Sequence, residues 1–190
     1  GSRKAMVVGA LPFMSYHLGP SQAMENAGNF IQKGGCQAVK LEGGVRMADT
    51  VNRLVENGIP VQGHIGLTPQ SINQLSGHKV QGRNPEAATQ LINDALALDQ
   101  AGAFSIVLES VPFGLAKVIT QRVNVPTIGI GSGKYCDGLV QVISDVLGLF
   151  DDFIPKHAKR YANLTHVIGA AANKYKEEVA ELVFGSNVMS

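Results

Sequence analysis

The chain has 190 residues, of which 45% are hydrophobic and 16% are charged. This composition predicts a folded domain with a real core and argues against a disordered chain. The net charge of +1 gives no reason to expect a nucleic acid or an anionic membrane surface as a partner, and no apolar run approaches membrane-spanning length. Cys36 and Cys136 lack the spacing of metal ligands, and together with the absence of a signal-peptide pattern they predict reduced thiols in a cytoplasmic protein.

Short apolar strands alternate with amphipathic helices through the first half of the chain. The first strand, over residues 5–11, ends at Pro12, and a helix with 3.6-residue periodicity opens at Gly19-Pro20-Ser21. The next predicted elements are a strand over 37–41, a helix striped by Met47, Val51, Leu54 and Val55 and ended by Gly58, and a strand over 60–65.

The second half continues this alternation after a segment rich in Gly, Gln, Asn and Ser, which predicts a functional loop over residues 68–85. The elements predicted after it are a helix over 86–100, a strand over 103–108, a helix over 113–122, a strand over 126–130 and a final helix over 174–183. Residues 139–147 are ambiguous between a short strand passing into a helix and a helix throughout.

This alternation predicts an α/β fold with a parallel sheet, either doubly wound or a (β/α)₈ TIM barrel. Glycines and ionisable residues at several strand ends favour the barrel. Five or six strands are too few to close a barrel, so we expect residues 1–190 to form a single barrel domain that lacks about two N-terminal βα units.

Glu109 directly follows an almost entirely apolar strand, the position at which α/β folds place their catalytic groups. A carboxylate there can act as a general base, and the alternative is an ordinary salt bridge to a neighbouring loop. Lys40 and Glu42 share one side of another strand, and in a cleft they would supply an oxyanion-stabilising cation and a hard oxygen ligand for Mg²⁺. The alternative for this pair is a simple ion pair on one face.

Three further motifs are less specific. His64, in Gly63-His64-Ile65-Gly66, stands at a third strand end, where a lone histidine is more often structural than catalytic. The glycines of residues 129–133 could form an anion-binding nest, but a tight turn is the better interpretation. His78, Lys79 and Arg83 are expected to be solvated, with contact to an anionic cofactor as the alternative.

Taken together, the motifs occur in an order that resembles the ketopantoate hydroxymethyltransferase family over nearly the whole chain. The strings that carry the resemblance are Leu11-Pro12-Phe13-Met14-Ser15-Tyr16, Val39-Lys40-Leu41-Glu42-Gly43-Gly44, residues 63–71 from Gly63-His64 to Gln70-Ser71, Lys79-Val80-Gln81-Gly82-Arg83, Val107-Leu108-Glu109, Gly129-Ile130-Gly131 and Cys136-Asp137-Gly138.

The resemblance implies a (β/α)₈ barrel that assembles as a decamer. It further implies transfer of a one-carbon unit from 5,10-methylenetetrahydrofolate to 3-methyl-2-oxobutanoate, with Mg²⁺, to form 2-dehydropantoate for pantothenate biosynthesis. On this basis Glu109 is the proton acceptor, Lys40 and His64 bind the keto acid, and Glu42 belongs to the metal's carboxylate shell.

Position 10 departs from the family pattern, which has an aspartate in contact with both metal and substrate where this chain has Ala10. Ser132 and Leu139 replace the commoner alanine and glutamine, with smaller consequences. Since Mg²⁺ can be held by few carboxylates together with water and substrate, we expect weakened metal binding. The alternative function is a catalytically impaired or truncated member of the family that acts only as an assembly partner.

Overall fold

A computed structural model describes residues 4–75, 77–152 and 154–181. The chain divides into two compact units, with the boundary between Val140 and Gln141. The prediction of one barrel domain over 1–190 stays a prediction.

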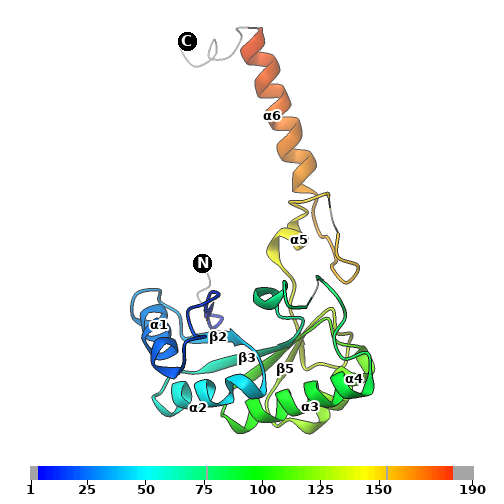
Figure 1. Cartoon of the computed structure of the whole chain (residues 1–190). Helices are drawn as coiled ribbons and strands as arrows, with labels where there is room; N and C mark the ends of the chain where they lie inside the picture. Colours follow the sequence, from blue (N-terminus) through cyan, green and yellow to red (C-terminus); the bar gives the residue numbers. More distant parts are fainter. Residues whose placement is uncertain (1–3, 76, 153, 182–190) are drawn as a thin grey trace. The chain divides into compact units, whose positions relative to one another are not determined.

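The first unit holds a parallel sheet of six strands in sequential order, β1 to β6. The strands are β1 (Val8–Ala10), β2 (Ala38–Glu42), β3 (Val61–Gly66), β4 (Ser105–Glu109), β5 (Thr127–Ile130) and β6 (Gly138–Leu139). The connecting helices are α1 (Pro20–Gln32), α2 (Ala48–Glu56), α3 (Pro85–Gln100) and α4 (Phe113–Arg122), with short 3₁₀ helices η1 (Val45–Met47) and η2 (Pro69–Ser71). In Figure 1 these four helices surround the outside of a curled sheet.

The strand order decides between the two predicted architectures. A doubly wound sheet reverses its strand order at a switch point and carries helices on both faces. Here the order never reverses, as in a (β/α)₈ barrel, of which the described sheet contains six strands. The prediction of a TIM-barrel fold class is confirmed.

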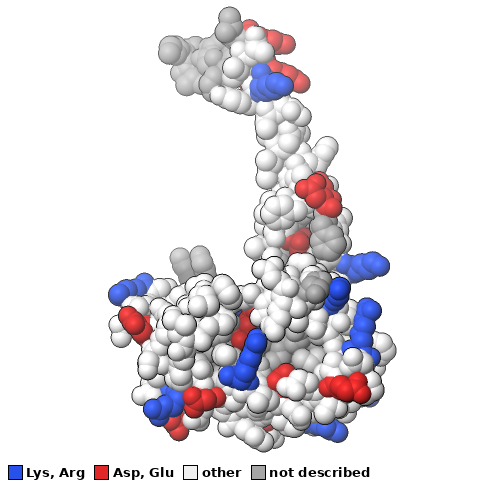
Figure 2. All heavy atoms as spheres, viewed as in Figure 1, with Lys and Arg blue, Asp and Glu red and all other residues white. Residues whose placement is uncertain are grey.

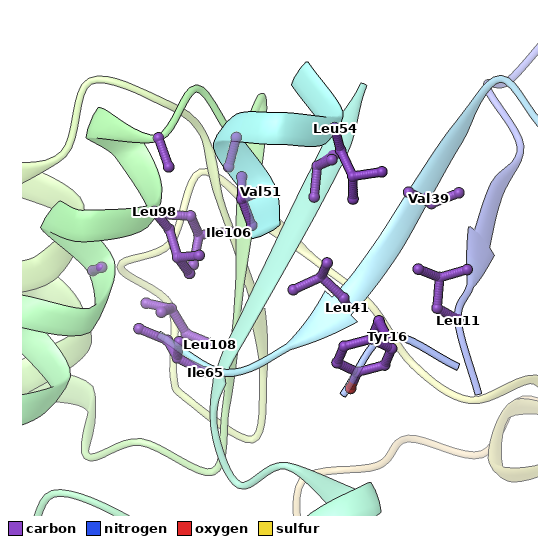
Figure 3. Close-up of a cluster of buried hydrophobic side chains, with 14 of the residues drawn as sticks. Leu11, Tyr16, Val39, Leu41, Val51, Leu54, Ile65, Leu98, Ile106 and Leu108 are labelled. Atoms are coloured by element: carbon purple, nitrogen blue, oxygen red, sulfur yellow. The ribbon is translucent and has the colours of Figure 1, made fainter. Parts of the chain in front are cut away.

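The main hydrophobic core lies between the outer face of the sheet and the helices. Leu41, Ile65 and Leu108 project from the strands, and Leu54 and Leu98 meet them from α2 and α3. Figure 3 shows this cluster, which also includes Tyr16. Because strand side chains alternate between faces, burying Leu41 in this core turns its neighbours Lys40 and Glu42 to the inner face of the sheet.

The second unit contains α5 (Ile143–Leu147) and α6 (Leu164–Ala180). The ambiguous segment 139–147 begins at the end of the short strand β6, continues through an irregular connection at 140–142 and ends as the helix α5, so the interpretation as a short strand passing into a helix is confirmed. The start predicted for the last helix, residue 174, was wrong by ten residues, because α6 begins at Leu164 with Asn163 as its N-cap. The run Gly169-Ala170-Ala171-Ala172, which lacks charges, is also part of this helix. The predicted end at 183 lies outside the described residues. No helix in the described ranges is long and apolar enough to span a membrane.

Candidate active site

Four ionisable side chains meet on the inner face of the sheet, at the carboxyl ends of β2, β3 and β4. The strand register pairs Glu42 with His64 and Gly66 with Glu109, so residues far apart in sequence share one edge. Paired residues of neighbouring parallel strands point to the same face, and Lys40 is two residues before Glu42 on that face. Lys40, Glu42, His64 and Glu109 are therefore brought together at one edge of the sheet.

His64 occupies the centre of this group. Its Nδ1 lies 3.4 Å from Lys40 Nζ and 3.7 Å from Glu42 Oε1, and its Nε2 lies 3.1 Å from Glu109 Oε2. An ammonium has no acceptor, so a hydrogen bond with Lys40 makes Nδ1 the acceptor and leaves the ring proton on Nε2, facing Glu109.

The contact between His64 and Glu109 is close but is not aligned as a hydrogen bond. Nε2 is buried and has no hydrogen-bond partner within the part of the chain that the structure describes, although Glu109 Oε2 is within ion-pair distance. A buried polar atom left without a partner is costly, and such atoms are common where a substrate completes the contacts. The side chain of Glu109 is 18% exposed and that of His64 is 4% exposed, so the carboxylate is the more accessible group of this pair.

Two glycines allow the backbone to form this edge. Gly66 adopts a φ of +92°, and a Cβ there would lie 2.3 Å from the carbonyl oxygen of Glu109, which accepts a hydrogen bond from Leu67. Gly43 adopts a φ of +120° immediately after Glu42. Ser110, directly after Glu109, has a φ of +51°, an uncommon conformation for serine.

Glu42 is held in a buried network that sequence reasoning missed. Its Oε2 accepts a hydrogen bond from the backbone N–H of Gln70 at 3.0 Å, and its own N–H donates to the Tyr16 hydroxyl at 3.2 Å. Burial raises the pKa of Tyr16 to about 12, with the charge of Glu42 adding to the rise, so this hydroxyl stays protonated. The signal available in the sequence was Tyr16 itself, a large aromatic with a polar tip in the loop after a predicted strand end.

Ser132 is a second residue that was underrated. Its buried hydroxyl donates to the carbonyl of Leu108 at 2.7 Å and accepts from the N–H of Val111 at 3.1 Å. It thereby fixes the backbone on both sides of Glu109, at the point where β4 ends and the following loop begins. Gly131 and Gly133 flank it with φ values of +63° and +80°, which supports the interpretation of residues 129–133 as a tight turn.

Ala10 lies beside the site, on the outermost strand. It pairs in register with Lys40, so its methyl group is on the same inner face, and it is exposed.

His78, Lys79 and Arg83 are exposed on the long loop, as expected for solvated residues. Charges of both signs are scattered over the face seen in Figure 2.

The side chains present do not form a metal site by themselves. No group of three or more His, Cys, Asp or Glu side chains that could hold a metal ion occurs among residues 4–75, 77–152 and 154–181. Glu42 is the carboxylate expected to bind Mg²⁺, and a single carboxylate needs further oxygen ligands from water or substrate.

A cavity of about 480 Å³ lies near the same strand ends but does not include this group. Its lining includes Arg46, Ile65, Leu91 and Asp94. Ile65 alternates with His64 along β3, and Leu91 and Asp94 belong to α3, so the cavity lies on the helix side of the sheet. Lys40, Glu42, His64 and Glu109 are on the opposite face.

A sequential parallel sheet with ionisable residues gathered at its carboxyl edge is the arrangement found in enzymes of the (β/α)-barrel class. The family model described as ketopantoate hydroxymethyltransferase matches residues 1–187. The chain belongs to the ketopantoate hydroxymethyltransferase family, which is a family of enzymes.

Curated relatives agree with this assignment. A protein named 3-methyl-2-oxobutanoate hydroxymethyltransferase from Dehalococcoides mccartyi strain BAV1 is 61% identical over 97% of this chain and 66% of its own length. Proteins of the same name from Syntrophomonas wolfei and Chloroflexus aurantiacus are 56% and 55% identical, over 94% and 97% of this chain and 64% and 65% of their own lengths. The chain therefore spans about two thirds of the length of these relatives.

Solved structures that resemble the chain are more distant. A putative phosphonomutase from Burkholderia cenocepacia J2315 is 15% identical and superposes with a TM-score of 0.49, over 66% of this chain and 55% of that one.

Proposed function

We propose that this chain, within a protein of its relatives' length, transfers a hydroxymethyl group from 5,10-methylenetetrahydrofolate to 3-methyl-2-oxobutanoate and forms 2-dehydropantoate. The observation that carries the proposal is the convergence of Lys40, His64 and Glu109 on one face of the sheet. His64 Nδ1 lies 3.4 Å from Lys40 Nζ, and His64 Nε2 lies 3.1 Å from Glu109 Oε2. The names of the curated relatives support the choice of substrate.

The reaction needs a base, and this role is assigned to Glu109. Its carboxylate is partly exposed at the inner face and accepts the proton from C3 of the keto acid. The C3–H electron pair then forms the C2=C3 double bond of an enolate, and negative charge moves to the oxygen on C2. Water cleaves both carbon–nitrogen bonds of the folate's one-carbon unit, which leaves as formaldehyde while the two folate nitrogens take the two protons of water. C3 then forms a bond to the formaldehyde carbon, and the resulting alkoxide takes the proton held by Glu109 to give the hydroxymethyl group.

Lys40 and His64 stabilise and orient the enolate. The ammonium of Lys40 is half-buried, and a cation in such a site stabilises a developing oxyanion more strongly than it would in water. The N–H on Nε2 of His64 points to the region beside Glu109 and is a donor for a substrate oxygen. Glu42 alone does not complete a metal site, and we expect it to take part in binding Mg²⁺ together with oxygen atoms of water and the keto acid.

Solvent-deuterium exchange at C3 of 3-methyl-2-oxobutanoate tests this function, because enolisation precedes folate chemistry and can be followed by NMR. The expected result is exchange that depends on the protein, and formation of 2-dehydropantoate when the folate is added. A folded protein of the relatives' length that catalyses neither reaction contradicts the proposal.

Ala10 favours a second candidate, an impaired member of the family that acts only as an assembly partner. Position 10 brings no carboxylate to the inner face beside Lys40. This candidate predicts association with a second chain without C3 exchange, which light scattering and the exchange assay distinguish from the first.

A further inference from the structure

Tyr16 and Gln70 join three strand ends beside the candidate active site. The Tyr16 hydroxyl donates to Gln70 Oε1 at 2.8 Å, and Gln70 Nε2 donates to the carbonyl of Leu11 at 2.8 Å. The N–H of Gln70 reaches Glu42 Oε2, and the N–H of Glu42 reaches Tyr16. Leu11 follows β1, Glu42 ends β2 and Gln70 follows β3, so two side chains tie together segments that are up to 59 residues apart.

The network is anchored in the hydrophobic core. The Tyr16 side chain is 1% exposed, and Figure 3 shows its ring beside Leu11 and Leu41. Each end of the Gln70 amide has a protein partner, and the tyrosine hydroxyl both donates and accepts. A satisfied network in a buried position restricts its members to one arrangement.

This arrangement determines which oxygen of Glu42 faces the reaction site. Because Oε2 is bound to the backbone of Gln70, the carboxylate cannot turn freely, and Oε1 is presented to His64 Nδ1 at 3.7 Å. We propose that Tyr16 and Gln70 are positioning residues that fix the Glu42 carboxylate toward Lys40 and His64 for binding of the keto acid. This inference rests on the proposed function.

The role differs from general stabilisation because it is local to Glu42. Any loss of a buried hydrogen bond destabilises the fold, wherever the bond lies. Thr127 provides a matched comparison, since its buried hydroxyl bonds to Thr120 and Asp137 at the beginning of β5, away from the carboxyl edge. Loss of the Tyr16 or Gln70 contacts acts directly on Glu42, whereas loss of the Thr127 contacts does not.

The test compares Tyr16→Phe, Gln70→Ala, the double variant and the control Thr127→Val. For each variant, the rate of solvent-deuterium exchange at C3 of the keto acid is measured without added folate. We expect each of the first two to lower the exchange rate at subsaturating keto acid about 10-fold, chiefly through a higher KM. The double variant should lose about the same 10-fold rather than 100-fold, since the two residues act as one unit. Thr127→Val should stay within about twofold of wild type even where its Tm falls equally.

Amide hydrogen exchange supplies a readout that is independent of activity. In Tyr16→Phe the N–H groups of Glu42 and Gln70 should lose protection, whereas Thr127→Val should leave both protected. Unchanged protection in Tyr16→Phe and Gln70→Ala overturns the network, and lost protection with wild-type C3 exchange overturns the positioning role. An equal loss of C3 exchange in Thr127→Val also overturns it. A wild-type protein without C3 exchange instead contradicts the proposed function, and the positioning role with it.

Discussion

His64 Nε2 lies 3.1 Å from Glu109 Oε2, while the opposite ring nitrogen lies 3.4 Å from Lys40 Nζ. The imidazole thus connects a cation to a carboxylate across three neighbouring strands. A lysine that donates to Nδ1 keeps the ring proton on Nε2, on the side that faces Glu109, where the proposed function places the keto acid.

Glu109→Gln should abolish most of the C3 exchange while preserving the shape of the site. Loss of a positioned base costs about 10²–10⁴-fold, because the amide cannot accept the proton. Glu25→Gln, on the exposed face of α1, is the matched control and should exchange at the wild-type rate. Undiminished exchange in Glu109→Gln, measured by NMR in deuterated buffer, would falsify the assignment of the base.

Ala10→Asp should tighten Mg²⁺ binding. The new carboxylate would stand on the inner face next to Lys40 and add a hard, negatively charged oxygen near Glu42. We expect Mg²⁺ to bind the wild type chiefly together with the keto acid, whose oxygens complete the shell, and to bind the variant more tightly and raise its C3 exchange. Titration calorimetry with and without the keto acid measures the Mg²⁺ affinity, and NMR in deuterated buffer measures the C3 exchange.

Ala10→Asn separates charge from shape in that experiment. It adds a side chain of nearly the same size without the negative charge, so it should tighten Mg²⁺ much less than Ala10→Asp. Equal affinities for wild type and Ala10→Asp would show that position 10 does not face the metal.

Gly66→Ala should destabilise the fold more than Gly58→Ala does. Both glycines have a positive φ, +92° and +83°, and a non-glycine residue in this region costs about 1–2 kcal/mol. Gly58 has open space where a Cβ would be, whereas at Gly66 the Cβ would meet the Glu109 carbonyl at 2.3 Å and Val111 at 2.8 Å. Thermal unfolding should show a larger fall in Tm for Gly66→Ala, accompanied by slower C3 exchange. Similar falls for both variants would mean that the backbone near Glu109 adjusts easily.

Alkylation of Cys136 should require a higher pH in the folded chain than in urea. Burial raises the pKa of its thiol, and hydrogen bonds from Thr127 and Thr120 offset only part of the rise. A raised pKa leaves less thiolate at any given pH, and the thiolate is the reactive form. Mass spectrometry of the Cys136 peptide after timed iodoacetamide treatment gives the rate at each pH. Coincident profiles in the folded and unfolded chain would contradict the shift.

Periodicity predicted most of the secondary structure because each element carries its own pattern. The apolar run before Glu109 became β4, and the spacing of Val51 and Leu54 became the buried stripe of α2. The start of α6 could not be read this way, since none of its residues is buried and its first half carries no apolar–polar contrast of useful strength.

The sequence by itself determined that Lys40, Glu42, His64 and Glu109 stand at the ends of parallel strands, because strand periodicity and chain order fix both their side of the sheet and their edge. Only the tertiary structure decided that Gln70 binds one oxygen of Glu42, that Tyr16 closes the network and that Ser132 holds the loop of Glu109. These contacts join residues 21 to 54 positions apart, and such contacts depend on how strands and loops pack in three dimensions, which no local pattern records.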